Sequence, residues 1–285
     1  MEEIAFAKIN LALHVRQRTP GGYHHIETLF AFAEEGDRLS VAEGEELSLV
    51  AGGAFAASLP PADANIVLAA ARALRQRYSI ARGAALRLDK RLPVAAGIGG
   101  GSADAAAALR LLQRWWQLPH EPEALLEIGR TLGADVAACI ISEPLRGEGR
   151  GDDLAAVDGS ALAGAPLLLV NPRIPVSTTA VFGAWDGVDR GPLAAGELLA
   201  AAQAGRNDLV PAALAIAPQI GDVLAALSAA NGVRLARMSG SGATCFALFA
   251  SEADRDAAFA AIAARHPGWW QCATRLRATP QGRSL

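Results

Sequence analysis

Alternating apolar and polar positions mark the first strand that the sequence predicts. Across residues 4–15 the apolar side chains recur at every second position, which is the period of a β-strand. The same period places Lys8 and Asn10 side by side on the face opposite the apolar set. A turn-rich stretch at 19–25 follows this strand, and further strand-like segments continue to about residue 50.

Ala-rich helical patterns and short strands alternate along the rest of the chain. In the first half the pattern predicts helices at 65–78, 103–116 and 122–131, a strand near 84–90 and a short helix from about residue 135. In the second half it predicts a strand at 167–170, helical segments within 178–230, strands at about 233–238 and 243–249, a helix at 252–265 and a last strand near 269–277. This order is typical of an α+β fold, in which helices are layered on an antiparallel sheet. A stretch rich in Gly, Asp and Arg at 147–164 predicts a boundary, so we expect domains at 1–160 and 161–285.

Composition and charge narrow the classes of function. The chain has 285 residues, of which 52% are hydrophobic, and its formal net charge is -3. This near balance provides no broad basic field for a polyanion, so we expect a small-molecule substrate and no nucleic acid. No apolar run approaches the roughly 20 residues that a membrane helix needs, and residues 1–3 lack the basic start of a secretory signal. We expect a cytoplasmic protein that uses no membrane and is a monomer or a weak homodimer.

Cysteine and lysine usage adds two expectations. The three cysteines are Cys139, Cys245 and Cys272. Their wide spacings fit neither a disulfide framework nor a zinc site, so we expect reduced thiols in the core. We assign no metal ligands. Only Lys8 and Lys90 are lysines, while every other basic side chain is an arginine. A compact ammonium is not interchangeable with a guanidinium at a phosphate or a reacting oxygen, which makes both lysines candidates for chemistry.

The strongest local signal is a glycine-rich loop at 93–104, between a predicted strand and a predicted helix. Four of the five positions 97–101 are glycines, which lets backbone N–H groups approach an anion, and we expect Ser102 to be the helix N-cap. The start of a helix adds free N–H groups and the positive end of its dipole, which suits a phosphate. The spacing matches neither a Walker A loop nor the dinucleotide fingerprint. A flexible glycine turn is the alternative interpretation.

A second glycine loop at 239–244 joins the two strands predicted at 233–249. Its sequence, Ser-Gly-Ser-Gly-Ala-Thr, is compatible with an ordinary hairpin. Its small residues would also allow it to close over a phosphate from the side opposite the first loop. Only the presence of the first loop favours this second interpretation.

Asp135 is the third feature, because it is a single carboxylate among small and apolar residues at 132–139. A carboxylate is costly to bury without a partner. As a helix N-cap it would be satisfied locally. The alternative is an active-site base paired with an ammonium, for which Lys8 is the candidate, since a neighbouring cation keeps a carboxylate ionised.

These pieces together resemble the motifs of the GHMP kinases, and the resemblance covers nearly the whole chain. Its markers are Ala7-Lys8-Ile9-Asn10-Leu11, Gly22-Tyr23-His24, Lys90-Arg91-Leu92-Pro93 followed by the loop at 97–102, Gly133-Ala134-Asp135-Val136, and Ser239-Gly240-Ser241-Gly242-Ala243. The order and spacing of five motifs are far more specific than any one motif. The resemblance implies a mixed α/β N-terminal domain and a ferredoxin-like C-terminal domain, with the active site in a cleft between them.

The resemblance also implies an ATP-dependent kinase that acts on a cytidine-tagged sugar alcohol with Mg²⁺. Asp135 would be the base on the accepting hydroxyl, and Lys8 would orient and stabilise it. The implied ATP-binding residues are Pro93, Val94, Ala95, Ala96, Gly97, Ile98, Gly99, Gly100, Gly101, Ser102 and Ala103, with Asn65 and Lys90 beside the adenine. The implied substrate-binding residues are Asn10, Tyr23, His24, Thr178, Phe182, Gly240 and Gly242.

Within this substrate set, Tyr23 would stack on the cytosine, His24 would hydrogen-bond its edge and Phe182 would close the other face. Alternatively, Tyr23 and His24 pack a turn, and Phe182 belongs to the core. The chain departs from the family pattern at Ala103 and Asp104, where many members carry Ser and Asn, and again at 147–152. Two rival functions remain: a GHMP kinase for homoserine, mevalonate or a sugar, and a non-catalytic nucleotide sensor.

Overall fold

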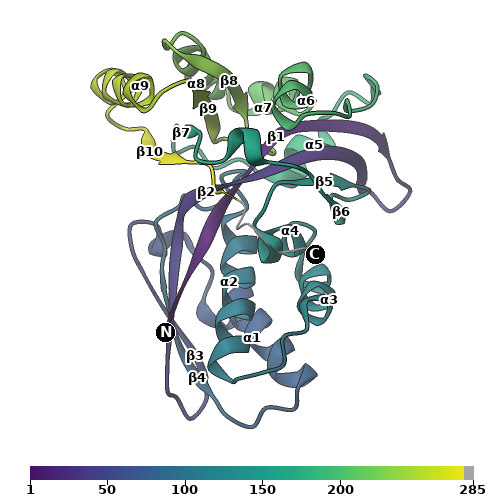
Figure 1. Ribbon diagram of the computed structural model, residues 1–285, viewed down its shortest axis with the longest axis vertical. Coiled ribbons are helices and arrows are strands. Elements are labelled where there is room, and N and C mark those ends of the chain that lie inside the picture. The colour runs from purple at the N-terminus through teal and green to yellow at the C-terminus, as the bar shows by residue number, and fades with distance from the viewer. Residues whose placement is uncertain (279–285) are drawn as a thin grey trace. The chain divides into compact units, whose positions relative to one another are not determined.

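The computed structural model describes residues 1–278, and most predicted elements are present in it (Figure 1). The strands are β1 (Glu2–Arg18), β2 (His24–Ala42), β3 (Leu47–Gly52), β4 (Ala84–Asp89), β5 (Leu145–Glu148), β6 (Asp153–Ala156), β7 (Pro166–Asn171), β8 (Val233–Met238), β9 (Cys245–Phe249) and β10 (Trp270–Arg275). The helices are α1 (Ile66–Arg77), α2 (Gly100–Trp115), α3 (Pro122–Leu132), α4 (Val136–Ile141), α5 (Thr178–Gly183), α6 (Leu198–Ala204), α7 (Val210–Ile216), α8 (Gln219–Ser228) and α9 (Glu252–Arg265). Short 3-10 turns lie at Ala56–Ser58, Ala62–Ala64 and Ser160–Leu162.

Packing divides the chain into two compact units, each built from separate segments of the sequence. Unit 1 comprises Met1–Ala7, Glu35–Val94 and Gly99–Ser142, and unit 2 comprises Lys8–Glu34, Ala95–Ile98 and the described chain from residue 143. The long strands β1 and β2 each contribute residues to both units. The two units therefore differ from the ranges 1–160 and 161–285, whose assignment as domains stays a prediction.

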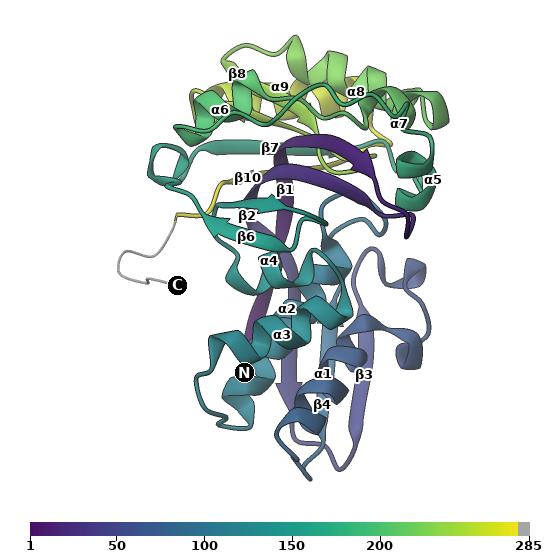
Figure 2. The same cartoon turned by 90° about the vertical axis from the view of Figure 1, so that its right-hand side faces the viewer.

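Unit 1 places helices on one face of a sheet. Strand β4 pairs in parallel with β3 and antiparallel with the second half of β2, from Arg38 opposite Asp89 to Ala42 opposite Ala85. Helix α1 begins after Asn65, whose side chain accepts a hydrogen bond from the main chain of Val67. Helix α2 contacts α1 and α4. The buried face of α2 is rich in alanine, whose small side chain allows neighbouring helices to pack closely. Figure 1 and Figure 2 both show these helices on the same side of β3 and β4.

Unit 2 contains a four-stranded antiparallel sheet in the order β10-β7-β9-β8. Along the chain, β7 is followed by helices, then by β8 and β9, then by α9 and finally by β10, which is the ferredoxin-like arrangement. Helices α8 and α9 pack against this sheet. Its core also includes Leu13, Val15 and Ile26, from β1 and β2. The prediction of an α+β fold with a ferredoxin-like C-terminal part is confirmed.

Three details differ from the sequence-based expectation. The stretch at 147–164, interpreted only as a boundary, overlaps the short strands β5 and β6, which pair with each other. The helical segments expected within 178–230 are four short helices with an irregular stretch between α5 and α6. Cys139 and Cys245 are core residues as expected, whereas Cys272 is half-buried.

Within residues 1–278, no helix has the length and apolar character needed to cross a membrane.

Candidate active site

The predicted neighbours Lys8 and Asn10 are joined by a hydrogen bond on β1. Lys8 Nζ donates to Asn10 Oδ1 at 2.9 Å, and Asn10 Nδ2 donates to Thr28 Oγ1 on β2 at 2.8 Å. The Lys8 ammonium also lies 4.9 Å from the ring centroid of Phe30. Lys8 is only 3% exposed, so these contacts fix the direction of its ammonium. The period of two predicted this pair of side chains correctly.

Both glycine loops contact the strand that carries Lys8. Within unit 2, the main-chain N–H of Lys8 donates to the carbonyl of Ile98 at 3.0 Å. The main-chain N–H of Asn10 donates to Ser239 Oγ at 3.2 Å, and that hydroxyl donates to the carbonyl of Gly97 at 2.8 Å. Ser239 therefore links β1, the first loop and the second loop. The hairpin at 239–244 is not an isolated turn.

Two glycines make this close approach of main chains possible. Gly97 has a φ of +75°, and a Cβ there would lie 2.4 Å from the carbonyl oxygen of Ser239. Gly240 has a φ of +54°, and its Cβ would lie 2.9 Å from the carbonyl oxygen of Gly97. Any side chain at either position would force one loop away from the other.

In unit 1, the other part of the first loop forms the start of α2. Gly99, at a φ of +64°, is the N-cap, and the main-chain N–H of Ala103 makes a helical bond to its carbonyl at 2.8 Å. The prediction of Ser102 as the N-cap is therefore wrong, because the left-handed Gly99 lets the helix begin earlier. Ser102 lies in the first turn, where N–H groups have no intrahelical partner. These groups and the helix dipole suit a phosphate.

Lys90 lies in a buried cluster of charged side chains in unit 1. Its Nζ donates to Asp37 Oδ2 and to Asp104 Oδ2, each at 2.6 Å, and all three side chains are at most 2% exposed. Burial lowers the pKa of Lys90, but the charges of Asp104 and Asp37 outweigh it, so the pKa is raised. Burial raises the pKa of Asp104 to about 8, against the opposing charge of Lys90. The departure from the family pattern at Asp104 thus supplies a second partner for Lys90, while a contact of Lys90 with ATP stays a prediction.

The remaining adenine candidate, Asn65, is 4% exposed and uses its Oδ1 to cap α1 by accepting from Val67 at 2.9 Å. A contact of Asn65 with ATP stays a prediction.

Asp135 occupies the N-cap position of α4, but its side chain makes no capping hydrogen bond. The alternative in which capping satisfies this carboxylate is therefore wrong. Asp135 is half-buried and belongs to unit 1, whereas Lys8 belongs to unit 2. The pairing of Asp135 with Lys8 stays a prediction.

His24 and Phe182 lie close together in unit 2, although they are far apart in the sequence. Their ring centroids lie 5.1 Å apart, and the ring of Trp185 approaches His24 edge-on at 5.6 Å. His24 is 8% exposed, whereas Tyr23 is 58% exposed. The guanidinium of Arg150 lies 4.4 Å from the ring centroid of Tyr23. Tyr23 therefore presents a large aromatic surface to solvent beside the less exposed group of rings around His24.

Thr178 joins the predicted substrate residues of the second loop. It is the first residue of α5, and its hydroxyl lies 3.0 Å from the hydroxyl of Ser241. Ser241 stands between Gly240 and Gly242. The predicted substrate residues Thr178, Gly240 and Gly242 therefore lie on adjoining segments of unit 2.

Four residues near these groups were missed by sequence analysis: Arg18, Asp37, Trp185 and Ser239. Trp185 follows Phe182 at a spacing of three, a helical period that was available as a signal. Ser239 lay inside a quoted motif but was given no role. Asp37 carried no local signal, because its partner Lys90 lies 53 positions further along the chain. Arg18 was overlooked although its partner His24 is close to it in sequence.

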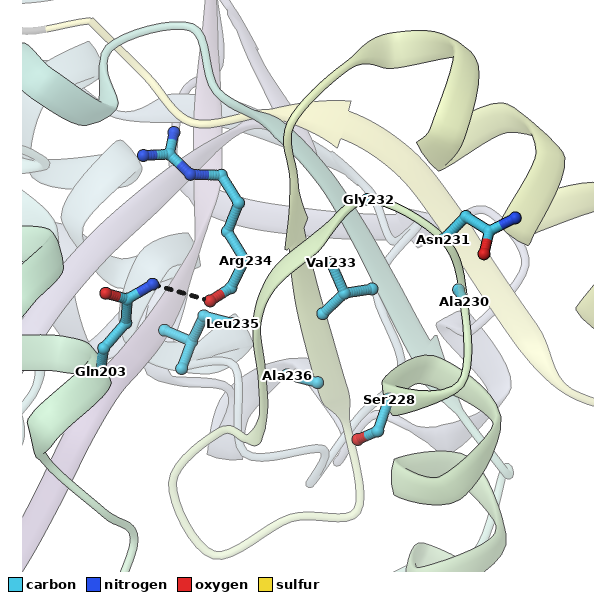
Figure 3. Close-up of a pocket in the computed structure, with 9 residues that line it drawn as sticks. All are labelled: Gln203, Ser228, Ala230, Asn231, Gly232, Val233, Arg234, Leu235 and Ala236. Atoms are coloured by element: carbon cyan, nitrogen blue, oxygen red, sulfur yellow. Dashed lines mark hydrogen bonds between the residues drawn. The ribbon is translucent and has the colours of Figure 1, made fainter.

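A surface hollow of about 670 Å³ in unit 2 contains none of the predicted residues (Figure 3). It is lined by Gln203, Ser228, Ala230, Asn231, Gly232, Val233, Arg234, Leu235 and Ala236. In it, Gln203 Nε2 donates to the main-chain oxygen of Arg234 at 2.9 Å, which links α6 to β8. Arg234 is the one charged residue among the nine that line the hollow.

Compared with known protein families, the chain matches the GHMP kinases N terminal domain over residues 65–143 and GHMP kinases C terminal over residues 192–268. A 4-diphosphocytidyl-2-C-methyl-D-erythritol kinase of Rhizorhabdus wittichii is 57% identical over 277 residues, covering 96% of this chain and 94% of the relative. The protein of that name from Sphingopyxis alaskensis is 55% identical, covering 97% and 99%. The chain belongs to the GHMP kinase family.

Solved structures agree with this assignment. The crystal structure of a 4-(cytidine 5'-diphospho)-2C-methyl-D-erythritol kinase superimposes with a TM-score of 0.81 at 31% identity, covering 98% of this chain and 100% of the other. A mevalonate kinase superimposes with a TM-score of 0.70 at 10% identity, covering 97% and 99%, which is a likeness of fold alone. The matched family regions lie on either side of residue 160.

Proposed function

We propose that this protein is an ATP-dependent kinase that phosphorylates the 2-hydroxyl of 4-diphosphocytidyl-2-C-methyl-D-erythritol, in the methylerythritol phosphate route to isoprenoid precursors. The observation that carries this proposal is the 57% identity, over nearly the full length, to a relative of that name. The aromatic group of Tyr23, His24 and Phe182 supports it, because such a group suits a flat base.

In the proposed mechanism, Asp135 accepts the proton of the substrate hydroxyl as the new phosphorus–oxygen bond forms. Lys8 orients that hydroxyl and stabilises the charge that develops on it. The hydrogen bond from Lys8 to Asn10 at 2.9 Å supports this role, since it holds the ammonium in one direction. Asn10 would contact the substrate beside Lys8.

ATP would bind with its phosphates at the start of α2. The residues fit such a group, because the left-handed Gly99 begins α2 and the first turn of α2 supplies free N–H groups. Gly240 and Gly242 would cover a phosphate from the second loop. Phosphoryl transfer requires mainly positioning and charge stabilisation, and these are the contributions that the two loops would make.

Mg²⁺ belongs to the proposal as the companion of ATP. Within residues 1–278, no three His, Cys, Asp or Glu side chains form a metal-binding group. Mg²⁺ is commonly held through substrate phosphates and only one or two carboxylates. When bound, the ion would neutralise charge on the β- and γ-phosphates.

The substrate's cytosine would lie between Tyr23 and Phe182, with His24 on its edge. Tyr23 is exposed and supported by Arg150, and Phe182 is half-buried beside His24. Thr178 would contact the substrate next to the second loop.

The first experiment measures ADP release with ATP and Mg²⁺, offering 4-diphosphocytidyl-2-C-methyl-D-erythritol, homoserine, mevalonate and galactose in parallel. We expect release with the first acceptor alone. Release with another acceptor would keep the kinase and discard the cytosine pocket. If ADP is released with none of the four acceptors, the result would favour the non-catalytic nucleotide sensor.

Asp135→Asn and Lys8→Ala then test the mechanism. Removing a general base or a charge-stabilising group is expected to lower kcat by about 10²- to 10⁴-fold. Thermal unfolding is measured alongside to show that the variants remain folded. A kcat within a factor of about three of the unmodified protein, in either variant, contradicts the role assigned to that residue.

A further inference from the structure

Arg18 holds one nitrogen of the His24 imidazole in a defined role. Arg18 Nε donates to His24 Nε2 at 3.3 Å, and Arg18 Nη2 donates to the carbonyl of Gly183, at the end of α5, at 3.1 Å. A guanidinium has donors only, so His24 Nε2 must present a lone pair to it. A neutral imidazole with a lone pair on Nε2 carries its proton on Nδ1.

The ring of His24 is also fixed in orientation. Phe182 lies at 5.1 Å with its plane tilted by 45°, and Trp185 lies at 5.6 Å with its plane at 83°. Burial, and secondarily the charge of Arg18, lower the pKa of His24 and so favour its neutral form. The Trp185 indole is buried, and its Nε1 makes no hydrogen bond among the described residues, so packing alone orients it.

We propose that Arg18 is a positioning and specificity-determining residue, which makes His24 a donor through Nδ1–H toward the base of the substrate. A donor at this point selects a ring nitrogen that has a lone pair, as cytosine has at N3. Uracil carries a hydrogen at N3 and presents a donor there, so two donors would oppose each other. Without Arg18 the proton is free to move to Nε2, and the preference for cytosine is lost.

The ligand class in this inference rests on the proposed function, but the proton position does not. The tautomer is measured first, on the protein without ligand, by ¹⁵N NMR of the five histidines, with the His24 signals assigned from His24→Asn. We expect the proton on Nδ1 in the unmodified protein and a shift toward Nε2 in Arg18→Met, which keeps the length of the side chain but removes its donors.

Two further variants separate positioning from general damage. Arg18→Lys keeps a donor and is expected to retain much of the Nδ1–H form. Arg77→Met is the matched control, because Arg77 is an exposed arginine whose guanidinium lies over the ring of Tyr78 in unit 1. It makes the same substitution beside an aromatic ring that is not His24. It should leave the His24 tautomer and the kinetics unchanged.

Kinetics then test specificity. Arg18→Met is expected to raise KM for the cytidine substrate about tenfold, the size of one hydrogen bond, with a smaller effect on kcat. The ratio of kcat/KM between the cytidine substrate and its uridine analogue should fall by a similar factor. A proton on Nε2 in the unmodified protein, or a tautomer and selectivity unchanged in Arg18→Met, overturns the proposal. If no acceptor is phosphorylated but the tautomer depends on Arg18, the proposed function fails and the positioning role stands.

Discussion

At the scale of single residues, the buried cluster of Lys90, Asp37 and Asp104 contains two carboxyl groups but only one ammonium. Two carboxylates share one ammonium, and Asp37 additionally accepts the main-chain N–H groups of Arg91 and Leu92 at 2.6 and 2.8 Å. Asp104 has no such additional donor, and its Oδ1 is buried without a hydrogen-bond partner among the described residues. Asp37 therefore accepts more hydrogen bonds than Asp104, and burial raises the pKa of Asp104.

This assignment predicts a pH dependence of stability. The pKa of Asp104 is raised from 3.8 to about 8 in the folded protein, so the folded state binds one proton more tightly than the unfolded state. Unfolding then releases that proton, and the free energy of unfolding falls as the pH rises from about 4 to about 8. Asp104→Asn keeps the shape without the titration, and urea unfolding across this range should show a flatter profile.

Asp89→Asn is the matched control, because Asp89 is a partly exposed carboxylate that pairs with Arg91 in the same unit. Its profile should follow that of the unmodified protein. The raised pKa of Lys90 acts outside this window, since lysine ordinarily titrates near 10.5. Equal slopes in Asp104→Asn and the unmodified protein would assign the proton to another group.

At the scale of elements, the two halves of the first glycine loop place different demands on the chain. A Cβ at Gly97 would lie 2.4 Å from the carbonyl oxygen of Ser239, and its φ of +75° disfavours any side chain. At Gly101, inside α2, the nearest atom to such a Cβ is a methyl of Ile66 at 3.8 Å. One glycine is required by the packing of unit 2, whereas the other is not required by the packing of unit 1.

The same substitution at these two positions should have opposite effects on stability. Gly97→Ala is expected to lower the free energy of unfolding by roughly 1–3 kcal/mol, because the second loop must move. Gly101→Ala is expected to raise it by up to about 1 kcal/mol, because alanine is the better helix former. Thermal and urea unfolding of both variants provide the comparison. A similar destabilisation at both positions would show that the contact of Gly97 with the second loop does not decide its identity.

Elements with a clear period were predicted well from the sequence, and those defined by distant partners were not. Helix α9 was placed at its observed bounds, and the alternation in β1 correctly set Lys8 beside Asn10. Strands β5 and β6 are only four residues long and contain too little pattern to detect. The N-cap of α2 was misassigned because the sequence does not reveal the left-handed backbone of Gly99.

The candidate site follows the same rule. Motif order identified the loops, but the link that Ser239 makes between them depends on residues far apart in sequence. The contact of Arg18 with His24 depends on which ring nitrogen faces the guanidinium, and no local pattern encodes that. The sequence therefore predicted which segments matter more reliably than how individual side chains are paired.

At the scale of the whole molecule, unit 2 depends on β1 and β2 although most of its residues come from the second half of the chain. Leu13 and Val15 belong to its core. The main-chain N–H of Val15 donates to Asp208 Oδ2 at 2.9 Å, and Arg237 donates to the carbonyl of Leu11. Asp208 is only 4% exposed, so removing β1 would leave buried polar groups without these partners.

A chain of residues 161–285 alone is therefore not expected to unfold cooperatively. A second chain that joins residues 8–34 to residues 143–285 through a flexible linker restores Leu13, Val15 and the pairing of β2 with β5, and should unfold more cooperatively. Circular dichroism during urea unfolding compares the two, with the full chain as reference. A sharp transition for 161–285 alone would show that the boundary at residue 160 delimits a part that folds by itself. A broad transition there, with a sharp one for the joined chain, would show that the folding unit includes β1 and therefore the strand that carries Lys8.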